Sequence, residues 1–170
     1  MPFRASPNPA INCRAVTFGA ARMLLHGSCA ALEGEAILFL APPGGGKSDL
    51  LLRLLGRGWV LVADDQVMLE ADQGLLRASP PAALAGRLEV FGLGLLAGLA
   101  WRAATLRLVA RLVPPAEIPR LPEPETWSAL GIGLPALRLH GAAPSAPDLL
   151  RRALDALAGR ASLTAGAFTA

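Results

Sequence analysis

The chain has 170 residues and a mass of 17.6 kDa, and its composition, 53% hydrophobic against 17% charged, excludes disorder over most of the length. The net charge of +3 comes from 16 Lys and Arg against 13 Asp and Glu, and the arginines are scattered, so no nucleic-acid partner is expected. No apolar run approaches the roughly 20 residues of a membrane span, so no membrane is expected either. With no secretory leader and only two cysteines, Cys13 and Cys29, the sequence predicts a cytoplasmic protein with reduced thiols.

The first elements surround a glycine-rich segment. Residues 22–32 alternate loosely and predict a strand with His26 in its middle. After a turn, residues 35–40 form a short apolar run that is typical of a buried strand. The glycine-rich segment 41–48 follows directly, and residues 49–55 then predict a helix.

The rest of the chain predicts a mixed architecture. The expected elements are a strand at 59–63, a hairpin of 66–70 and 75–78, weaker strands at 87–91, 106–113 and 137–139, and an amphipathic helix at 148–158. Pro- and Gly-rich segments at 114–124 and 141–147 are candidate mobile loops. We therefore expect one α/β domain over 1–170, a mixed β-sheet with flanking helices, a loose leader at 1–14 and a frayed tail at 160–170.

The glycine-rich segment has the form of a phosphate-binding P-loop. Its glycines can turn successive N–H groups inward, and the helix that follows favours negative charge at its start. Lys47, the only lysine of the chain, falls where a cation would meet the β- and γ-phosphates of a nucleotide, and Ser48 falls where a hydroxyl would bind Mg²⁺. We assign nucleotide binding to Pro43, Gly44, Gly45, Gly46, Lys47, Ser48 and Asp49. The usual pattern begins with glycine where this chain has Ala41, and the alternative is a turn that only links strand to helix.

Acidic residues supply the second group of candidates. The apolar run before Asp64 has the form of a Walker B strand, and Asp64 at its carboxyl end could hold Mg²⁺. Asp65 should point differently and could act as a base toward an attacking hydroxyl; the alternative is a solvated turn. Glu89 lies within an apolar strand, where it is either solvent-facing or functional. His26 and Arg120 carry no assignment from pattern alone.

Taken together, these segments resemble the catalytic domain of the HPr kinase/phosphorylase family. The matching residues are Leu25-His26-Gly27, Pro43–Asp49, Arg57-Gly58, Leu61–Asp65, Leu88-Glu89-Val90 and Gly92-Leu93-Gly94, in the family's order and spacing. The resemblance runs from about residue 22 to about residue 139, and the RG-x-x-LVADD run is more specific than the P-loop alone. The chain looks like a short form without the N-terminal domain of larger members.

The resemblance implies ATP- and Mg²⁺-dependent phosphorylation of a serine on HPr, the phosphocarrier of the phosphotransferase system, and also phosphorolysis of the product. It implies a homo-oligomer, a hexamer in the family. It implies that His26, Lys47, Asp65 and Arg120 are catalytic and that Ser48, Asp64 and Glu89 hold metal. In this reading Asp65 accepts the serine proton.

Departures from the family pattern keep other functions open. Phe91 stands where the family often has arginine, and 139–147 lacks the basic Pro-Gly-Arg-Asn loop that is tied to phosphorolysis. The alternatives are an ATP-binding regulatory module without phosphotransfer and a P-loop kinase of a small molecule.

Overall fold

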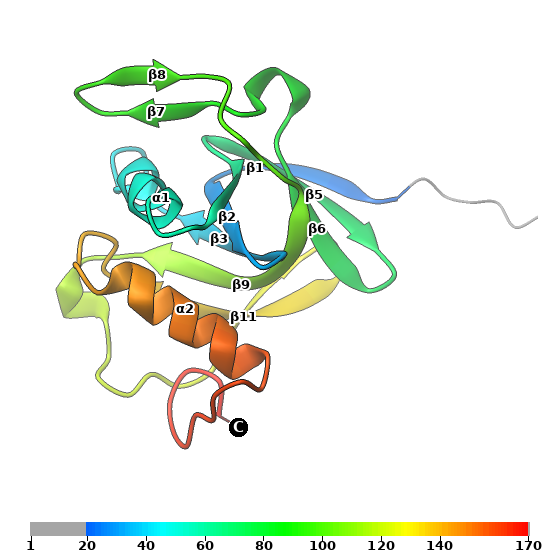
Figure 1. Ribbon diagram of the computed structural model, residues 1–170. Coiled ribbons are helices and arrows are strands. Elements are labelled where there is room, and N and C mark those ends of the chain that lie inside the picture. Colours follow the sequence, from blue (N-terminus) through cyan, green and yellow to red (C-terminus); the bar gives the residue numbers. More distant parts are fainter. Residues whose placement is uncertain (1–19, 170) are drawn as a thin grey trace, which may run out of the picture.

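The computed structural model describes residues 20–169, so the expected leader 1–14 and Cys13 lie outside the described residues (Figure 1). The strands and helices, in chain order, are β1 (Arg22–His26), β2 (Ser28–Leu32), β3 (Glu35–Leu40), α1 (Lys47–Leu55), β4 (Val60–Ala63), β5 (Gln66–Asp72), β6 (Leu75–Ser79), η1 (Ala82–Leu84), β7 (Leu88–Val90), β8 (Gly94–Leu96), β9 (Ala104–Leu112), η2 (Pro115–Glu117), β10 (Glu125–Ala129), β11 (Ile132–Leu139) and α2 (Ala146–Leu157).

Nine strands form one mixed sheet, which confirms the predicted fold class. Its main path runs β1-β5-β6-β9-β3-β2-β4, and β11 joins the far end of β9 in parallel and pairs with β10 as a hairpin. The strand before the glycine-rich segment, β3, runs parallel to β9. Because β2 is antiparallel to both β3 and β4, these two strands run in the same direction and end at the same edge of the sheet.

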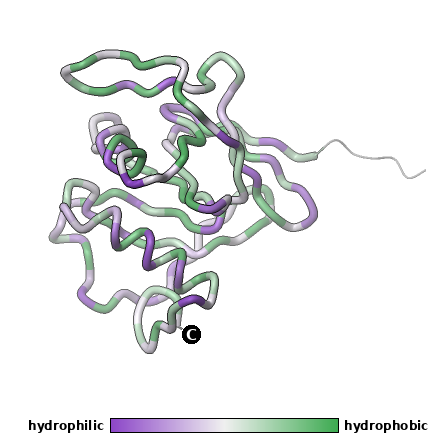
Figure 2. The backbone as a smooth tube through the Cα atoms, viewed as in Figure 1, coloured by the Kyte–Doolittle hydropathy of each residue, from purple (hydrophilic) through white to green (hydrophobic). Residues whose placement is uncertain are grey.

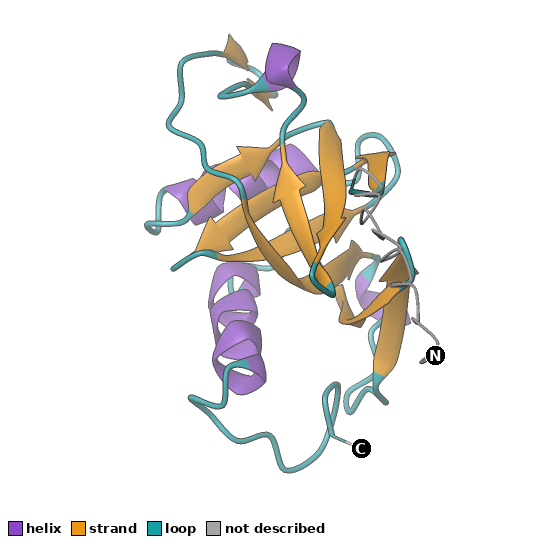
Figure 3. Ribbon diagram, turned by 90° about the vertical axis from the view of Figure 1, so that its right-hand side faces the viewer, coloured by secondary structure: helices purple, strands orange, loops and turns teal. Residues whose placement is uncertain are grey.

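The two ends of this sheet are parts of one two-stranded ribbon. His26 pairs with Gln66, the Gly27 N–H donates to the Asp65 carbonyl at 3.1 Å, and Cys29 pairs with Ala63. The antiparallel register of the β1–β5 pair therefore reaches the first pair of β2 and β4, Cys29 with Ala63, and shifts after Cys29. The sheet is strongly curled (Figure 3). Asp64 and Asp65 lie where the β1–β5 pair passes into the β2–β4 pair.

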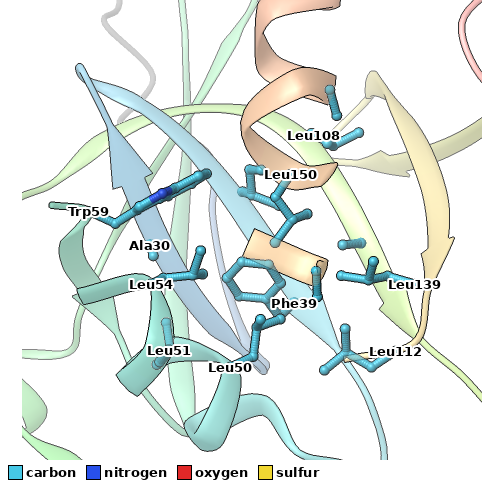
Figure 4. Close-up of a cluster of buried hydrophobic side chains, with 14 of the residues drawn as sticks. Ala30, Phe39, Leu50, Leu51, Leu54, Trp59, Leu108, Leu112, Leu139 and Leu150 are labelled. Carbon is cyan, nitrogen blue, oxygen red and sulfur yellow. The ribbon is translucent and has the colours of Figure 1, made fainter. Parts of the chain in front are cut away.

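The curled sheet buries both of its faces. Alternate side chains of β3 point in opposite directions, so Ile37 and Phe39 enter one core cluster while Leu38 enters the other. Both helices pack against the first cluster, where Leu50 of α1 and Leu150 of α2 approach Phe39 (Figure 4). The second cluster consists of strand and near-strand residues alone, so the sheet closes over itself on that side.

Several predicted boundaries differ from those in the structure. The single strand expected at 22–32 is broken at Gly27, so His26 ends β1 instead of lying in mid-strand. Helix α1 starts at Lys47, two residues before the expected start. In the expected frayed tail 160–170, Phe168 packs against the first core cluster. The other expected strands and the second helix are present, some extended or shortened at their ends.

A small hairpin of β7 and β8 stands apart from the main sheet, above α1 in Figure 1. Phe91, Leu93 and Leu95 on it are exposed, and part of its backbone tube is green in Figure 2. The chain returns from the hairpin past the edge of β4, where Trp101 bridges to Leu61. None of the helices between residues 20 and 169 has the length and apolar character that crossing a membrane requires.

Candidate phosphoryl-transfer site

The glycine-rich segment connects the end of β3 to the first turn of α1, as the sequence predicts. Gly44 and Gly46 have φ of 75° and 84°, a region that side chains disfavour. Gly45 is constrained differently, because a Cβ there would lie 2.6 Å from the Ala41 Cβ. The first N–H that the helix pairs in its own ladder is that of Leu50, which donates to the Gly46 carbonyl at 3.0 Å. The preceding amides of the first turn therefore point out of the helix start, toward the space in front of the loop.

Lys47 is buried and its side chain folds back over the loop. Its Nζ donates to the carbonyl oxygens of Ala41 at 3.0 Å and Pro42 at 3.3 Å. Burial lowers the pKa of Lys47 from its ordinary value, while the negative charges of Asp64 and Asp65 act in the opposite direction. Ala41, which stands where the usual motif begins with glycine, thus provides a backbone oxygen that accepts a hydrogen bond from Lys47.

Asp64 is a buried carboxylate that accepts hydrogen bonds from three separate elements. Ser28 Oγ of β2 donates to Oδ1 at 2.7 Å, and Ser48 Oγ of α1 donates to Oδ1 at 3.1 Å and Oδ2 at 3.2 Å. The backbone N–H of Glu89 in β7 donates to Oδ2 at 3.2 Å. These donors offset the cost of burying the charge and fix the orientation of the carboxylate.

Asp65 differs from its neighbour in exposure and in backbone conformation. Its φ is 67°, and its side chain is 65% exposed and faces the solvent side of the site. His26 Nδ1 lies 3.3 Å from Asp65 Oδ1 across the ribbon. The two acids of the Asp64-Asp65 pair therefore have separate surroundings, one buried beside the loop and one exposed to solvent.

One cavity of about 670 Å³ brings most of the predicted site residues together. Its lining residues are His26, Pro43, Gly44, Gly45, Gly46, Lys47, Ser48, Asp49, Leu52, Asp64, Asp65, Glu89, Val90 and Phe91. Ser28, Leu52, Val90 and Phe91 are contributions that the site prediction missed. Ser28 lies behind the cavity on Asp64, and a buried serine within a strand has no sequence signature that would have marked it.

Arg120 does not line this cavity. It is exposed on the connection between η2 and β10, which Figure 1 places on the far side of α2 from the β7–β8 hairpin. The other predicted mobile segment, 141–147, is tied to α1, because Arg53 donates to the carbonyl of Ala143 at 3.1 Å and to that of Gly141. Arg53 also pairs with Asp49 at 3.1 Å, an acid of the first turn of α1 that lines the cavity.

The oxygen ligands fit a Mg²⁺ ion that arrives with a nucleotide. The Ser48 hydroxyl and the Asp64 carboxylate already approach each other, and Glu89 lines the same cavity. Within residues 20–169 no three His, Cys, Asp or Glu side chains converge on one point. This arrangement suits Mg²⁺, which is commonly bound through one or two protein carboxylates while water and phosphate oxygens complete the shell.

A strand, a glycine-rich loop and a helix in direct succession, with an acid at the end of a second strand of the same direction, define a P-loop domain. Comparisons with known proteins point to a family. Residues 18–100 match the family described as the HPr Serine kinase C-terminal domain. The chain is 36% identical over 135 residues to HPr kinase/phosphorylase of Burkholderia cenocepacia, covering 73% of this chain and 42% of that protein. It is 43% identical over 72 residues to the Clostridium tetani protein of the same name, covering 42% of this chain and 24% of the relative.

A solved structure agrees with these matches at the level of the fold. It is described as the Hpr(Ser) kinase/phosphatase from Coxiella burnetii, and it superposes with a TM-score of 0.71 at 23% identity, over 81% of this chain and 97% of the other. These comparisons relate the chain to the HPr kinase/phosphorylase family, with the C-terminal domain of that family matched over residues 18–100. It spans less than half the length of the curated relatives that it matches.

Proposed function

We propose that this protein is an ATP-dependent kinase that phosphorylates a serine of HPr or an HPr-like phosphocarrier. The observation that carries the proposal is the single cavity in which the glycine loop, Lys47, Asp64 and Asp65 meet. Phosphoryl transfer depends on positioning and on neutralising charge, and these residues supply both. The relatives named HPr kinase/phosphorylase support the choice of acceptor.

In this proposal the loop amides and Lys47 hold the phosphates of ATP. Lys47 exchanges the carbonyls of Ala41 and Pro42 for phosphate oxygens, a stronger charge-assisted interaction. Ser48 and Asp64, with Glu89, would hold Mg²⁺, which when bound neutralises charge on the phosphates. Asp64 keeps its donors from Ser28 and from the Glu89 N–H when Ser48 turns toward the metal.

Asp65 acts as the base in the transfer step. The acceptor serine approaches from the open side of the cavity, and Asp65 takes the hydroxyl proton as the serine oxygen bonds to the γ-phosphorus. The bond from that phosphorus to the β–γ bridging oxygen breaks, and ADP leaves. His26, 3.3 Å from the Asp65 carboxylate, orients it toward the acceptor.

Arg120 has a different place in the proposal. Because it lies outside the cavity, a catalytic role requires the segment before β10 to change position, or a second copy of the chain to supply this side chain. A homo-oligomer, a hexamer by resemblance to the family, is compatible with the exposed Phe91, Leu93 and Leu95 of the β7–β8 hairpin. We propose that the protein works in the cytoplasm, where a phosphocarrier would be found.

The reverse reaction is a separate part of the proposal. Phosphorolysis requires free phosphate to bind beside the phosphoserine, and a cation would favour that binding. Phe91 lines the cavity where a cationic side chain would serve this step, so we propose that the forward reaction is the stronger of the two.

The test is a labelling experiment with the purified 170-residue chain. It is incubated with γ-labelled ATP, Mg²⁺ and the HPr-like protein of the same genome, and the labelled residue is mapped. Label on a serine of the acceptor supports the kinase, and excess phosphate then measures the reverse reaction. ATP binding without label would indicate a regulatory module, and label on a metabolite instead would indicate a small-molecule kinase.

A further inference from the structure

Among residues 20–169 the buried polar or charged side chains are three, and all three lie at one place. They are Ser28, Lys47 and Asp64, at 0%, 7% and 7% exposure. Burying a polar group is costly and is tolerated where the group has partners or a use. Lys47 and Asp64 belong to the P-loop and the acid strand, whereas Ser28 lies on β2, does not line the cavity and enters the proposed function only as a donor to Asp64.

The position of Ser28 follows from the sheet register. Cys29 pairs with Ala63, and the next antiparallel step places Ser28 beside Asp64, just past the end of β4. The 2.7 Å bond from Ser28 Oγ to Asp64 Oδ1 is the shortest of those that reach this carboxylate. Because strand pairing fixes the backbone of β2, the hydroxyl has little freedom to leave its acceptor.

The three donors to Asp64 differ in what else they can do. The Glu89 N–H is a backbone group, and the Ser28 hydroxyl is fully buried. Ser48 is partly exposed and lines the cavity, so it is the donor that can change partner. Without Ser28, Oδ1 would depend on Ser48 alone, and the carboxylate could turn when Ser48 leaves.

From this we propose that Ser28 is a positioning residue: its hydroxyl holds the Asp64 carboxylate in place so that Ser48 can release it and turn to a metal-bound nucleotide. The proposal rests on the proposed function only in taking Asp64 and Ser48 as the metal-facing pair, and it does not depend on the acceptor. It predicts that Ser28 determines how strongly Mg²⁺ improves nucleotide binding and has little effect on metal-free binding.

The experiment measures the dissociation constant of a non-hydrolysable ATP analogue by calorimetry, with and without Mg²⁺, on the full chain. For the wild type, Mg²⁺ should tighten binding. In Ser28→Ala we expect that gain to shrink about tenfold, the scale of one hydrogen bond to a charged group, with metal-free binding little changed. Ser28→Cys, close in size but a weak donor, should behave like Ser28→Ala, and Ser28→Thr should retain the wild-type gain.

A matched control separates positioning from folding. Cys29 is the next residue of the same strand, is equally buried and belongs to the second core cluster, which the sheet closes over. Cys29→Ala should lower the unfolding temperature and leave the Mg²⁺ gain unchanged. An unchanged gain in both Ser28→Ala and Ser28→Cys would overturn the positioning role even if the chain phosphorylates HPr. A reduced gain with no HPr labelling would support it and reject the acceptor instead, and a wild type without any Mg²⁺ gain would overturn both.

Discussion

Ser48 Oγ donates to both carboxylate oxygens of Asp64, at 3.1 and 3.2 Å. This contact joins the first turn of α1 to the end of β4, two segments that carry the two halves of the proposed phosphate site. The cavity in front of them is lined by the loop glycines and by Lys47. A ligand that enters must therefore compete with interactions that the protein already makes with itself.

Lys47 gives the first prediction. Lys47→Ala should abolish labelling of the acceptor and weaken ATP binding, because the loop loses its mobile cation while Asp64 stays buried and negative. The measurements are acceptor labelling and calorimetric binding, with circular dichroism to verify folding. Arg57→Ala, an exposed cation just beyond the same helix, is the control and should leave both unchanged. Full labelling by Lys47→Ala would mean that the site lies elsewhere.

Asp65 gives the second prediction. Its φ of 67° is tolerated by Asn better than by most non-glycine residues, so Asp65→Asn removes the charge and keeps a side chain of the same shape with little backbone strain. We expect labelling to fall about 10²- to 10⁴-fold, the usual contribution of a general base, with ATP binding retained. Single-turnover labelling and calorimetry distinguish these effects. If binding and transfer were lost together, Asp65 would belong to the metal site and not to the proton transfer.

The sequence predicts most of the residues that line the cavity because each part has a local signature. A glycine run before Lys47 and a pair of acids after an apolar strand are readable without a structure, and so is the 66–78 hairpin with its turn residues. The cavity then groups them as expected.

Long-range pairing explains what the sequence left out. The break at Gly27 has no signature in the sequence, because β1 and β2 follow each other directly and differ only in the strands they pair with. Strand β11 is predicted only over 137–139, and β10 is not predicted at all. In the structure β11 begins at Ile132, and its Pro135 pairs with Thr126 of β10, a position where proline usually argues against a strand. Ser28 becomes notable only when Asp64 is beside it.

Arg120 gives the third prediction, and it tests a residue that the single chain leaves outside the cavity. Arg120→Ala should lower the transfer rate while ATP binding is unchanged, because an arginine that folds over the reacting phosphoryl group stabilises its charge only during transfer. Acceptor labelling at saturating ATP is the measurement, and Arg111→Ala on the exposed face of β9 is the control. Equal rates for the two variants would remove Arg120 from the catalytic residues.

Mixing variants shows how Arg120 reaches the site. If a second copy supplies it, Arg120→Ala mixed with Lys47→Ala should regain part of the activity, because some assembled sites then contain an intact loop and an intact arginine. If the segment moves within one chain, the mixture should show no more than the residual activity of its Arg120→Ala chains. Sedimentation at the assay concentration establishes whether the chains associate.

Cys29 gives the fourth prediction, which concerns stability at alkaline pH. Burial raises the pKa of the Cys29 thiol far above its ordinary value of 9.0, so the native state keeps a proton that the unfolded chain gives up. Unfolding is therefore favoured as pH rises above about 9, and the free energy of unfolding should fall by about 1.4 kcal/mol per pH unit from this group. The chain has no tyrosine and one lysine, so few other groups titrate in this window.

Urea unfolding, followed by tryptophan fluorescence, measures this slope from about pH 8 up to about pH 10.5, which is close to the ordinary pKa of a lysine side chain. Lys47 acts in the opposite direction, since its lowered pKa means that the unfolded chain holds more protons just below that value. Cys29→Ala should therefore remove the fall and leave a flat or slightly rising stability, at the cost of a smaller free energy of unfolding at neutral pH. A wild-type slope that survives in Cys29→Ala would show that another group, not the buried thiol, destabilises the fold in alkali.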